Sequence, residues 1–277
     1  MKKDFDYIVV GAGSAGCAVA NRLSENNKNT VLLIEAGRSS HPISRLPASF
    51  ALFIDNPMVN WRYRSEPEES TSNRAMPVPR GKLLGGSSSI NGLVFVRGQK
   101  LDYDTWAQMG NTGWSYDDVL PFFKKMENYQ GKKSELRGDN GPLKVSEVSD
   151  RNPIYNALFE SSESLGIPFN EDYNGDEQEG IGYTQTTIFN GERMSAEVAY
   201  LKPIKSRTNL TISSNSLVTK LLFDGKTCIG VEVKNKNKIF SYNASKEVIL
   251  CGGAINSPQI LELSGVGNPE ILEENNI

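Results

Sequence analysis

Apolar positions near the start of the chain form two short, unbroken runs with a stretch of small residues between them. The first run is Tyr7 to Val10 and leads into Gly11 to Gly16; the second is Thr30 to Ile34 and ends at Glu35. Such runs are typical of strands buried in a parallel sheet, and the small residues suit a helix packed closely on that sheet. The pattern predicts strand, glycine-rich turn, helix and strand, which places the chain in the α/β class.

The last third of the chain alternates apolar and polar positions in a way that indicates antiparallel strands. Residues 217–223, 227–233 and 239–242 predict a small meander. The segment 247–251, which is apolar after Glu247, predicts a separate buried strand. Two glycines follow it, and their bare backbone can approach a ligand closely.

Between these regions the pattern is first helical and then polar. In residues 101–127, apolar positions at helical spacing predict an amphipathic helix capped near Ser115 or Asp117, with its aromatic side chains in the core. Residues 130–140 lack periodicity, so we expect an exposed loop whose lysines and arginines face solvent. Residues 170–182 are rich in acids and glycine without the spacing of a calcium-binding EF-hand loop, which favours a mobile lid or a crossover loop.

Composition and charge exclude several classes of protein. The chain has 277 residues, 38% of them apolar, which is enough for a core, and it lacks the run of about eighteen apolar residues that predicts a membrane span. Its net charge is −3, with lysine and arginine spread along the chain, which argues against a nucleic-acid surface. The N-terminus predicts a strand and not a signal peptide. Three cysteines without metal-ligand spacing favour a cytoplasmic protein with no metal site.

The first glycine-rich segment has the spacing of a dinucleotide-binding loop, Gly-x-Gly-x-x-Gly. Gly11 permits the tight turn, Gly13 lets the backbone touch a pyrophosphate, and Gly16 allows close contact between helix and strand. The N-terminus of the helix that follows offers free N–H groups and a partial positive charge to phosphates, and Ser14 in the loop is expected to contact the cofactor. These features predict a dinucleotide site.

The acidic residue after the second strand narrows the choice of dinucleotide. Glu35 lies nineteen residues after Gly16 and can accept hydrogen bonds from a ribose diol, with Ala36 beside it at the same strand end. An acid at this place disfavours NADP, which carries a 2′-phosphate on that ribose. The loop alone does not choose between NAD and FAD.

A second glycine-serine run, Gly85 to Ser89, lies about fifty residues beyond Glu35. Glycine and serine at this density are typical of flexible linkers. Here, however, the run is flanked by Leu84 and Ile90, which favour burial, so we predict a packed turn whose backbone approaches a ligand. A nicotinamide enzyme does not ordinarily need this second segment, whereas a bulkier cofactor with an isoalloxazine ring does.

Two segments of the chain carry a family resemblance. Residues 81–91 and 253–267 resemble the signatures of the glucose–methanol–choline oxidoreductases, FAD-dependent alcohol oxidases and dehydrogenases, and choline dehydrogenase-like members are the nearest in pattern. The resemblance implies FAD as the cofactor. Its implied contacts are Gly85, Gly86, Ser87, Asn91, Gly92, Val94 and Val218.

The resemblance also assigns parts of FAD to these residues. Ser87 and Asn91 are expected to hydrogen-bond the phosphate and ribityl portion, and the backbone of Gly92 and Val94 is expected to lie against the flavin ring. The strand that contains Val218 is expected to meet the adenine.

A domain order and a reaction follow from the same resemblance. Residues 1–140 and 191–277 are expected to form two segments of a Rossmann-like FAD-binding domain, and residues 141–190 an incomplete α+β substrate domain. The expected reaction removes hydride from an alcohol carbon onto flavin N5 while a base takes the hydroxyl proton.

No residue of the chain is identified as that base. In the family it is a histidine, paired with a second histidine or an asparagine, in the C-terminal part; here the one histidine is His41, expected in a surface loop. We therefore expect the FAD-binding portion of an enzyme acting on a small alcohol, truncated or split, with a second chain supplying the C-terminal half. The alternatives are a non-catalytic FAD-binding remnant or interaction module, and an NAD-dependent dehydrogenase, which the two signatures disfavour.

Overall fold

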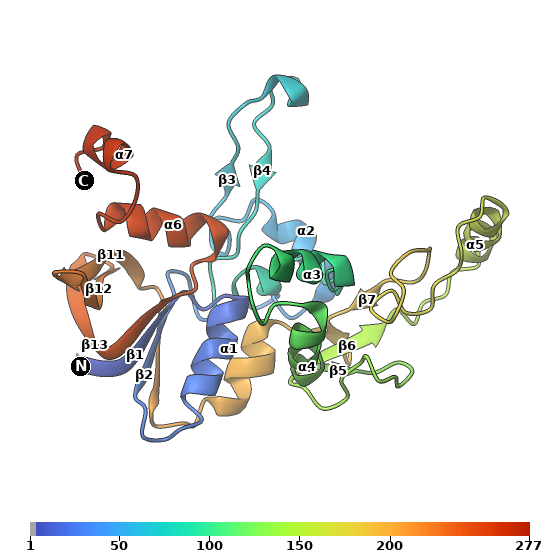
Figure 1. The fold of residues 1–277 in the computed structure, drawn as a ribbon, viewed down its shortest axis with the longest axis horizontal. Helices are drawn as coiled ribbons and strands as arrows, with labels where there is room; N and C mark the ends of the chain where they lie inside the picture. The colour runs from blue at the N-terminus through green and yellow to red at the C-terminus, as the bar shows by residue number, and fades with distance from the viewer. Residues whose placement is uncertain (1–3) are drawn as a thin grey trace. The chain divides into compact units, whose positions relative to one another are not determined.

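The computed structural model describes residues 4–277, which divide into two compact units. The first consists of the residues up to Asn91 together with Ser195–Ile277, and the second is Gly92–Met194. Figure 1 shows the elements of both in chain order. No helix within residues 4–277 is both long enough and apolar enough to cross a membrane.

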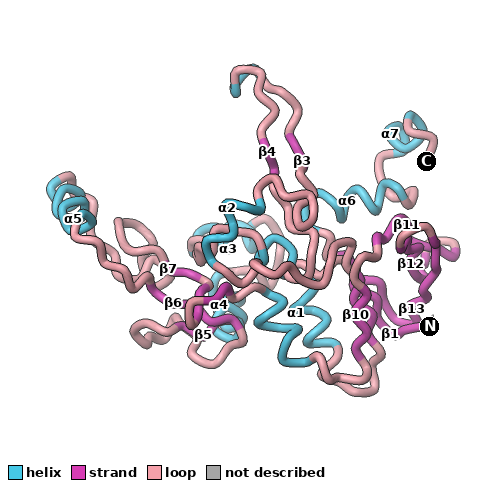
Figure 2. Tube along the Cα trace, turned by 180° about the vertical axis from the view of Figure 1, so that it is seen from behind, coloured by secondary structure: helices cyan, strands magenta, loops and turns pink. Residues whose placement is uncertain are grey.

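A six-stranded sheet forms the centre of the first unit (Figures 1 and 2). Its order is β10-β2-β1-β13-β12-β11; the first four strands run parallel, and β12 and β11 are antiparallel to their neighbours. This mixed, mostly parallel sheet confirms the predicted α/β class. The strands are β1 (Asp4–Val10), β2 (Val31–Ile34), β10 (Leu210–Ser213), β11 (Leu217–Asp224), β12 (Thr227–Asn235) and β13 (Lys238–Leu250).

Helices pack on this sheet, and a thin two-stranded ribbon, β3–β4, projects from the same unit (Figure 1). Helix α1 packs on β1 and β2, and α6 packs on β11. The remaining elements of the unit are α1 (Ser14–Leu23), α2 (Phe50–Phe53), α6 (Gly253–Leu263), α7 (Pro269–Glu274), β3 (Tyr63–Arg64), β4 (Pro77–Val78) and the single turns η1 (Pro47–Ser49), η2 (Glu69–Thr71), η3 (Gly86–Ser89), η4 (Glu197–Leu201) and η5 (Lys202–Ile204).

The core of the first unit comes from the apolar runs that predict its strands. Ile8 and Leu32 are almost completely buried, and Val231, Tyr242 and Ile260 belong to the same cluster. Burying an aliphatic side chain of this size contributes roughly 1.5–3 kcal/mol. The cluster therefore joins the parallel strands, the antiparallel meander and helix α6 into one unit.

The predicted meander is confirmed, but two strands differ from expectation. The runs at 239–242 and 247–251 belong to a single strand, β13, which pairs with β12 up to Asn243 and with β1 from Asn243 onward. The mostly polar residues 243–246 interrupt the apolar pattern without ending the strand, because neighbouring strands still supply its backbone hydrogen bonds. Strand β10 is not among the predicted elements, since four residues at a sheet edge give too short an alternation to recognise.

The second unit contains a three-stranded sheet, β5-β6-β7, with a parallel and an antiparallel pair. Ser115 caps α4 as predicted: its hydroxyl accepts a hydrogen bond from the backbone N–H of Asp118. The elements are α3 (Lys100–Gln108), α4 (Tyr116–Met126), β5 (Glu127–Tyr129), β6 (Leu143–Glu147), α5 (Ile154–Ser164), β7 (Gln185–Thr186), β8 (Ile188–Phe189) and β9 (Glu192–Arg193).

This unit extends beyond the expected segment 141–190, because β5 pairs with β6 and brings α3 and α4 with it. Its assignment to a substrate domain stays a prediction. The expected burial of the aromatic side chains was wrong: Trp106, Trp114 and Phe122 are 45%, 52% and 69% exposed. The reason is that α3 and α4 pack on each other and neither contains a buried residue.

Two loops of the second unit are also more ordered than their composition predicts. Arg137, expected to face solvent, is only 5% exposed and forms ion pairs with Glu127 and Asp172. In the segment 170–182, Asn174 is 3% exposed and hydrogen-bonds the backbone of residues 95 and 97, which does not fit a mobile lid. Composition alone does not reveal these long-range partners.

Asp6 gives the first unit a pH-dependent contribution to its stability. The backbone N–H and the hydroxyl of Thr30 donate to its carboxylate at 2.7 and 3.0 Å, and these bonds lower the pKa of Asp6 to about 2. Because the folded-state pKa lies below its ordinary value, this stabilisation is present above about pH 4 and is lost as the pH falls toward 2.

We therefore expect Asp6→Asn to lower the free energy of unfolding at pH 7, and the difference from the unsubstituted chain to shrink between pH 4 and pH 2. Urea denaturation across this range measures both values. A difference that stays constant down to pH 2 would contradict the assignment.

Candidate dinucleotide-binding site

A crevice of about 640 Å³ lies in the first unit, at the carboxyl ends of β1, β2 and β13. In this sheet β1 lies between β2 and β13, so the loop that follows β1 begins at a point with further strands on both sides. Open parallel sheets bind ligands at such a point. Eight of the predicted cofactor residues line the crevice: Gly11, Gly13, Ser14, Glu35, Ala36, Gly86, Ser87 and Val218.

Close backbone contacts shape the loop after β1. Gly11 has a φ of +97°, and a Cβ there would lie 2.5 Å from the carbonyl oxygen of Cys251. A Cβ at Gly16 would overlap the carbonyl oxygen of Gly11. Only glycine therefore lets α1 begin this close to β1 and β13.

Gly13 differs from the other two glycines of the motif. Its φ of −74° is open to any residue, and a Cβ there would meet no atom within 4 Å. The fold therefore does not require glycine at this position. Its missing side chain instead leaves the crevice open at the start of α1, where the first N–H groups of the helix lack intrahelical partners.

The second glycine-serine segment packs directly on the first. The backbone N–H of Gly85 donates to the carbonyl oxygen of Ala12 at 2.8 Å. Gly86 has a φ of +54°, and a Cβ there would lie 2.7 Å from the Cα of Gly13. The segment is thus a packed turn, as predicted, and the two glycine-rich segments form adjoining walls of one crevice.

The serines of this segment fix its conformation. The Ser87 hydroxyl accepts a hydrogen bond from the N–H of Gly81 at 3.1 Å, and the Ser89 hydroxyl donates to the carbonyl of Leu84 at 2.8 Å. Among the three serines, only Ser87 lines the crevice. The serines that make this segment resemble a flexible linker therefore form hydrogen bonds that hold it in a packed turn.

Glu35 connects the end of β2 to both neighbouring turns. Its two carboxylate oxygens accept hydrogen bonds from the N–H groups of Ala12 and Gly37, each at 2.9 Å. Burial raises the pKa of Glu35, while these N–H donors and the charge of Lys82 oppose the rise. The carboxylate thus already holds the glycine loop, and its remaining lone pairs are the ones a ribose diol would use.

Five predicted cofactor residues do not line the crevice. Gly16 and Gly85 lie behind it, in the backbone contacts just described, and Asn91 is exposed. Gly92 and Val94 belong to the second unit, where both are exposed. The roles of these residues toward a flavin stay predictions.

Several crevice residues were not singled out from the sequence. Trp61 and Arg80 line it, and Trp61 stacks on Tyr63 with ring centres 5.8 Å apart. The Tyr63 hydroxyl accepts a hydrogen bond from Asn256, another lining residue, at 2.7 Å. Trp61 and Tyr63 could have been recognised from the sequence, because aromatic residues two positions apart in an extended segment lie on the same side of it.

His41 and the cysteines do not supply a reactive group to this site. His41 is half-buried against Phe53, not on the surface as expected, and burial lowers its pKa. It does not line the crevice. Burial raises the pKa of Cys17 to about 12 and also raises that of Cys251, so both thiols stay protonated, the unreactive form, at neutral pH.

A family model described as GMC oxidoreductase matches residues 5–275, nearly the whole chain. The chain belongs to the GMC oxidoreductase family. The family predicted from the two signatures at 81–91 and 253–267 is therefore confirmed.

Curated relatives of this GMC chain include two bacterial enzymes named oxygen-dependent choline dehydrogenase. The one from Brucella suis biovar 1 is 43% identical over 273 residues, which cover 98% of this chain and 50% of the relative. The one from Rhizobium johnstonii is 43% identical over 270 residues, covering 97% and 49%. The chain thus spans about half the length of the curated relatives it matches.

Two solved structures have the same fold as this chain. Pyridoxine 4-oxidase from Mesorbium loti has a TM-score of 0.92 at 34% identity, covering 97% of this chain and 53% of that protein. A formate oxidase variant from Aspergillus oryzae RIB40, described for its effect on FAD modification, has a TM-score of 0.91 at 30% identity, covering 100% and 50%.

Proposed function

We propose that the crevice of the first unit binds the adenosine diphosphate portion of FAD. The observation that carries this proposal is the contact between the two glycine-rich segments, Gly11–Gly16 and Gly85–Ser89, which line one crevice together with Glu35. The FAD named for the related formate oxidase supports FAD over NAD.

The lining residues fit the parts of this portion of the cofactor. The start of α1 beside Gly13 offers N–H groups to the pyrophosphate, Glu35 offers carboxylate lone pairs to the ribose, and the strand at Val218 meets the adenine. When bound, the flavin supplies the acceptor for a hydride.

We infer that the activity is oxidation of a CH–OH group in a small alcohol. The names of the relatives support an alcohol, since choline and pyridoxine both carry hydroxyl groups. We propose that a second polypeptide, equivalent to the other half of the relatives, supplies the proton acceptor. The sparse free cysteines support a cytoplasmic setting.

The alternative function is that of a non-catalytic FAD-binding remnant, favoured by the position of His41 away from the crevice. Turnover with dichlorophenolindophenol and a panel of small alcohols separates the two. The FAD-loaded chain is assayed alone and with the C-terminal half of the Brucella relative. We expect turnover only in the mixture; FAD binding without turnover in either sample would favour the remnant.

A further inference from the structure

The crevice of the first unit contains one positively charged side chain. Among the described residues that line it, only Glu35 and Arg80 carry a charge. The carboxylate of Glu35 already accepts hydrogen bonds from two backbone N–H groups. The diphosphate of a nucleotide is an anion, and the planar fork of an arginine side chain binds phosphate oxygens well. Arg80 is therefore the cation of this crevice that a diphosphate would meet.

A buried asparagine fixes the backbone at Arg80, below the strands of the β3–β4 ribbon (Figure 1). The Oδ1 of Asn60, which is 2% exposed, accepts from the backbone N–H groups of Arg62 at 2.8 Å and Arg80 at 3.0 Å. Its Nδ2 donates to the carbonyls of Phe53 and Ile54 at 3.0 and 2.7 Å. Because all four hydrogen-bonding positions of this amide are used, both strands of the ribbon start from one fixed arrangement.

The residue after Arg80 packs on the second glycine-serine segment. The N–H of Gly81 donates to the hydroxyl of Ser87 at 3.1 Å, and a Cβ at Gly81 would lie 2.2 Å from the carbonyl carbon of Gly86. A Cβ at Gly86 would in turn lie 2.7 Å from the Cα of Gly13, at the start of α1. These contacts place Arg80 one residue from the turn that borders the helix N-terminus proposed to bind the pyrophosphate.

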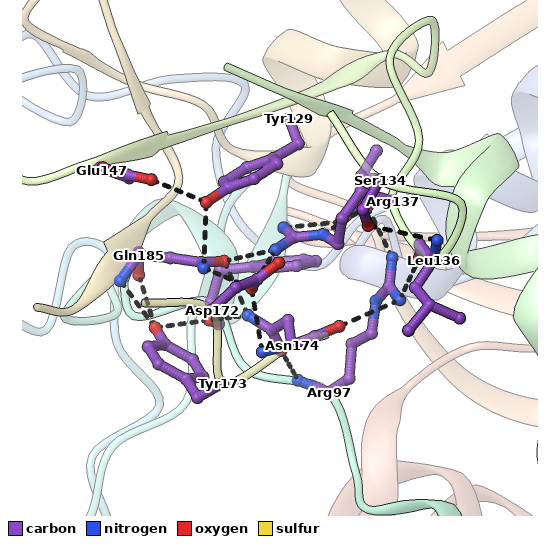
Figure 3. Close-up of polar contacts among 12 residues, drawn as sticks. Arg97, Tyr129, Ser134, Leu136, Arg137, Glu147, Asp172, Tyr173, Asn174 and Gln185 are labelled. Atoms are coloured by element: carbon purple, nitrogen blue, oxygen red, sulfur yellow. Dashed lines mark hydrogen bonds and ion pairs between the residues drawn. The ribbon is translucent and has the colours of Figure 1, made fainter. Parts of the chain in front are cut away.

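The guanidinium group of Arg80 has hydrogen-bond donors available for a ligand. Its Nη1 donates to the Pro79 carbonyl at 2.8 Å, and no carboxylate within residues 4–277 pairs with it. Arg97 and Arg137 of the second unit differ, because their guanidinium groups pair with the carboxylate of Glu127 at 2.6 and 2.9 Å (Figure 3). Arg80 is exposed, and most of its five N–H donors are free to bind phosphate oxygens.

The nearest lysine in the sequence has other contacts. Lys82 does not line the crevice. Its Nζ lies over the Trp61 ring, 4.3 Å from the ring centre, and its charge opposes the rise in the pKa of Glu35. The positive charge of Lys82 therefore supports the walls of the crevice, whereas that of Arg80 faces a ligand.

We propose that Arg80 binds the diphosphate of the cofactor and supplies the counter-charge to its phosphate oxygens. The inference rests on the proposed function and deepens it, because it names the cation that favours a nucleoside diphosphate over an uncharged nucleoside. It requires no residue of the second unit, since Arg80, its supporting asparagine and both glycine-rich segments all belong to the first.

Arg80→Gln tests the proposal, because it removes the charge from an exposed side chain on which the fold does not depend. Arg64→Gln is the matched control: Arg64 lies on β3 of the same ribbon, is exposed and donates to the Ala75 carbonyl at 3.1 Å, but does not line the crevice. Isothermal titration calorimetry measures the affinities of the full chains for ADP and for adenosine, at low and at high salt.

We expect Arg80→Gln to weaken ADP binding by about tenfold or more and to leave adenosine binding unchanged, while Arg64→Gln changes neither. Added salt should weaken ADP binding less in Arg80→Gln than in the other two chains. An unchanged ADP affinity in Arg80→Gln, or an equal loss in Arg64→Gln, would overturn the proposal. An unsubstituted chain that binds neither ADP nor FAD would instead overturn the proposed function.

Discussion

Replacing Gly13 by leucine is expected to abolish cofactor binding and to leave the chain folded. A Cβ at this position would meet no atom within 4 Å, and the φ of −74° is one that leucine adopts freely. The added atoms would instead occupy the start of α1, where the pyrophosphate must approach the backbone. We expect the affinity for FAD and for ADP to fall by about a hundredfold or more.

Isothermal titration calorimetry with each ligand measures this loss, and thermal unfolding reports the fold. Gly16→Ala is the contrasting variant, because its Cβ would overlap the carbonyl oxygen of Gly11 and should lower the free energy of unfolding by at least about 1–3 kcal/mol. A leucine variant at position 13 that binds FAD as tightly as the unsubstituted chain would remove the crevice from consideration as the cofactor site.

Replacing Glu127 by alanine is expected to destabilise the second unit by about 3–5 kcal/mol. Glu127 is completely buried, and its carboxylate neutralises Arg97 and Arg137 while it also accepts from the N–H of Gly138 at 2.8 Å. Its removal leaves two guanidinium groups buried without their main counter-charge. This is the largest effect on stability that we expect from a change in this unit.

Denaturation followed by tryptophan fluorescence measures the effect, since Trp106 and Trp114 both lie in the second unit. The control is Asp139→Ala, which breaks an ion pair with Lys133 whose two side chains are 64% and 85% exposed. That change should alter the free energy of unfolding by no more than about 1 kcal/mol. If the two substitutions lowered the free energy of unfolding equally, the buried ion pairs of Glu127 would contribute no more to stability than an exposed ion pair does.

The positions of the glycines predict the local structure around the crevice well. Gly11 and Gly16 are required by backbone contacts, and Gly85 and Gly86 have positive φ values, so each residue reports its own local geometry. The contact between the two segments was not predicted; the sequence indicated only that each approaches a ligand. Local sequence and local structure agree in these places, which makes the prediction reliable.

The rest depends on partners distant in the sequence. Arg137 resembles a solvent-facing arginine until Glu127, Asp172 and Gln185 come together around it. The mostly polar segment 243–246 resembles a strand end in the sequence, but in the structure β1 pairs with it. Trp114 and Phe122 resemble core residues, yet α3 and α4 offer them little to pack against. In each case tertiary context overrides the local pattern.

Recognition of FAD by the first unit is expected to depend on the adenosine diphosphate portion of the cofactor. A titration of the purified chain with FAD, followed by gel filtration and a visible absorption spectrum, tests this with ADP and FMN as competitors. We predict saturable FAD binding that ADP displaces and FMN, which lacks that portion, does not. A folded chain that binds neither FAD nor ADP, or that binds FMN as tightly as FAD, would contradict the claim.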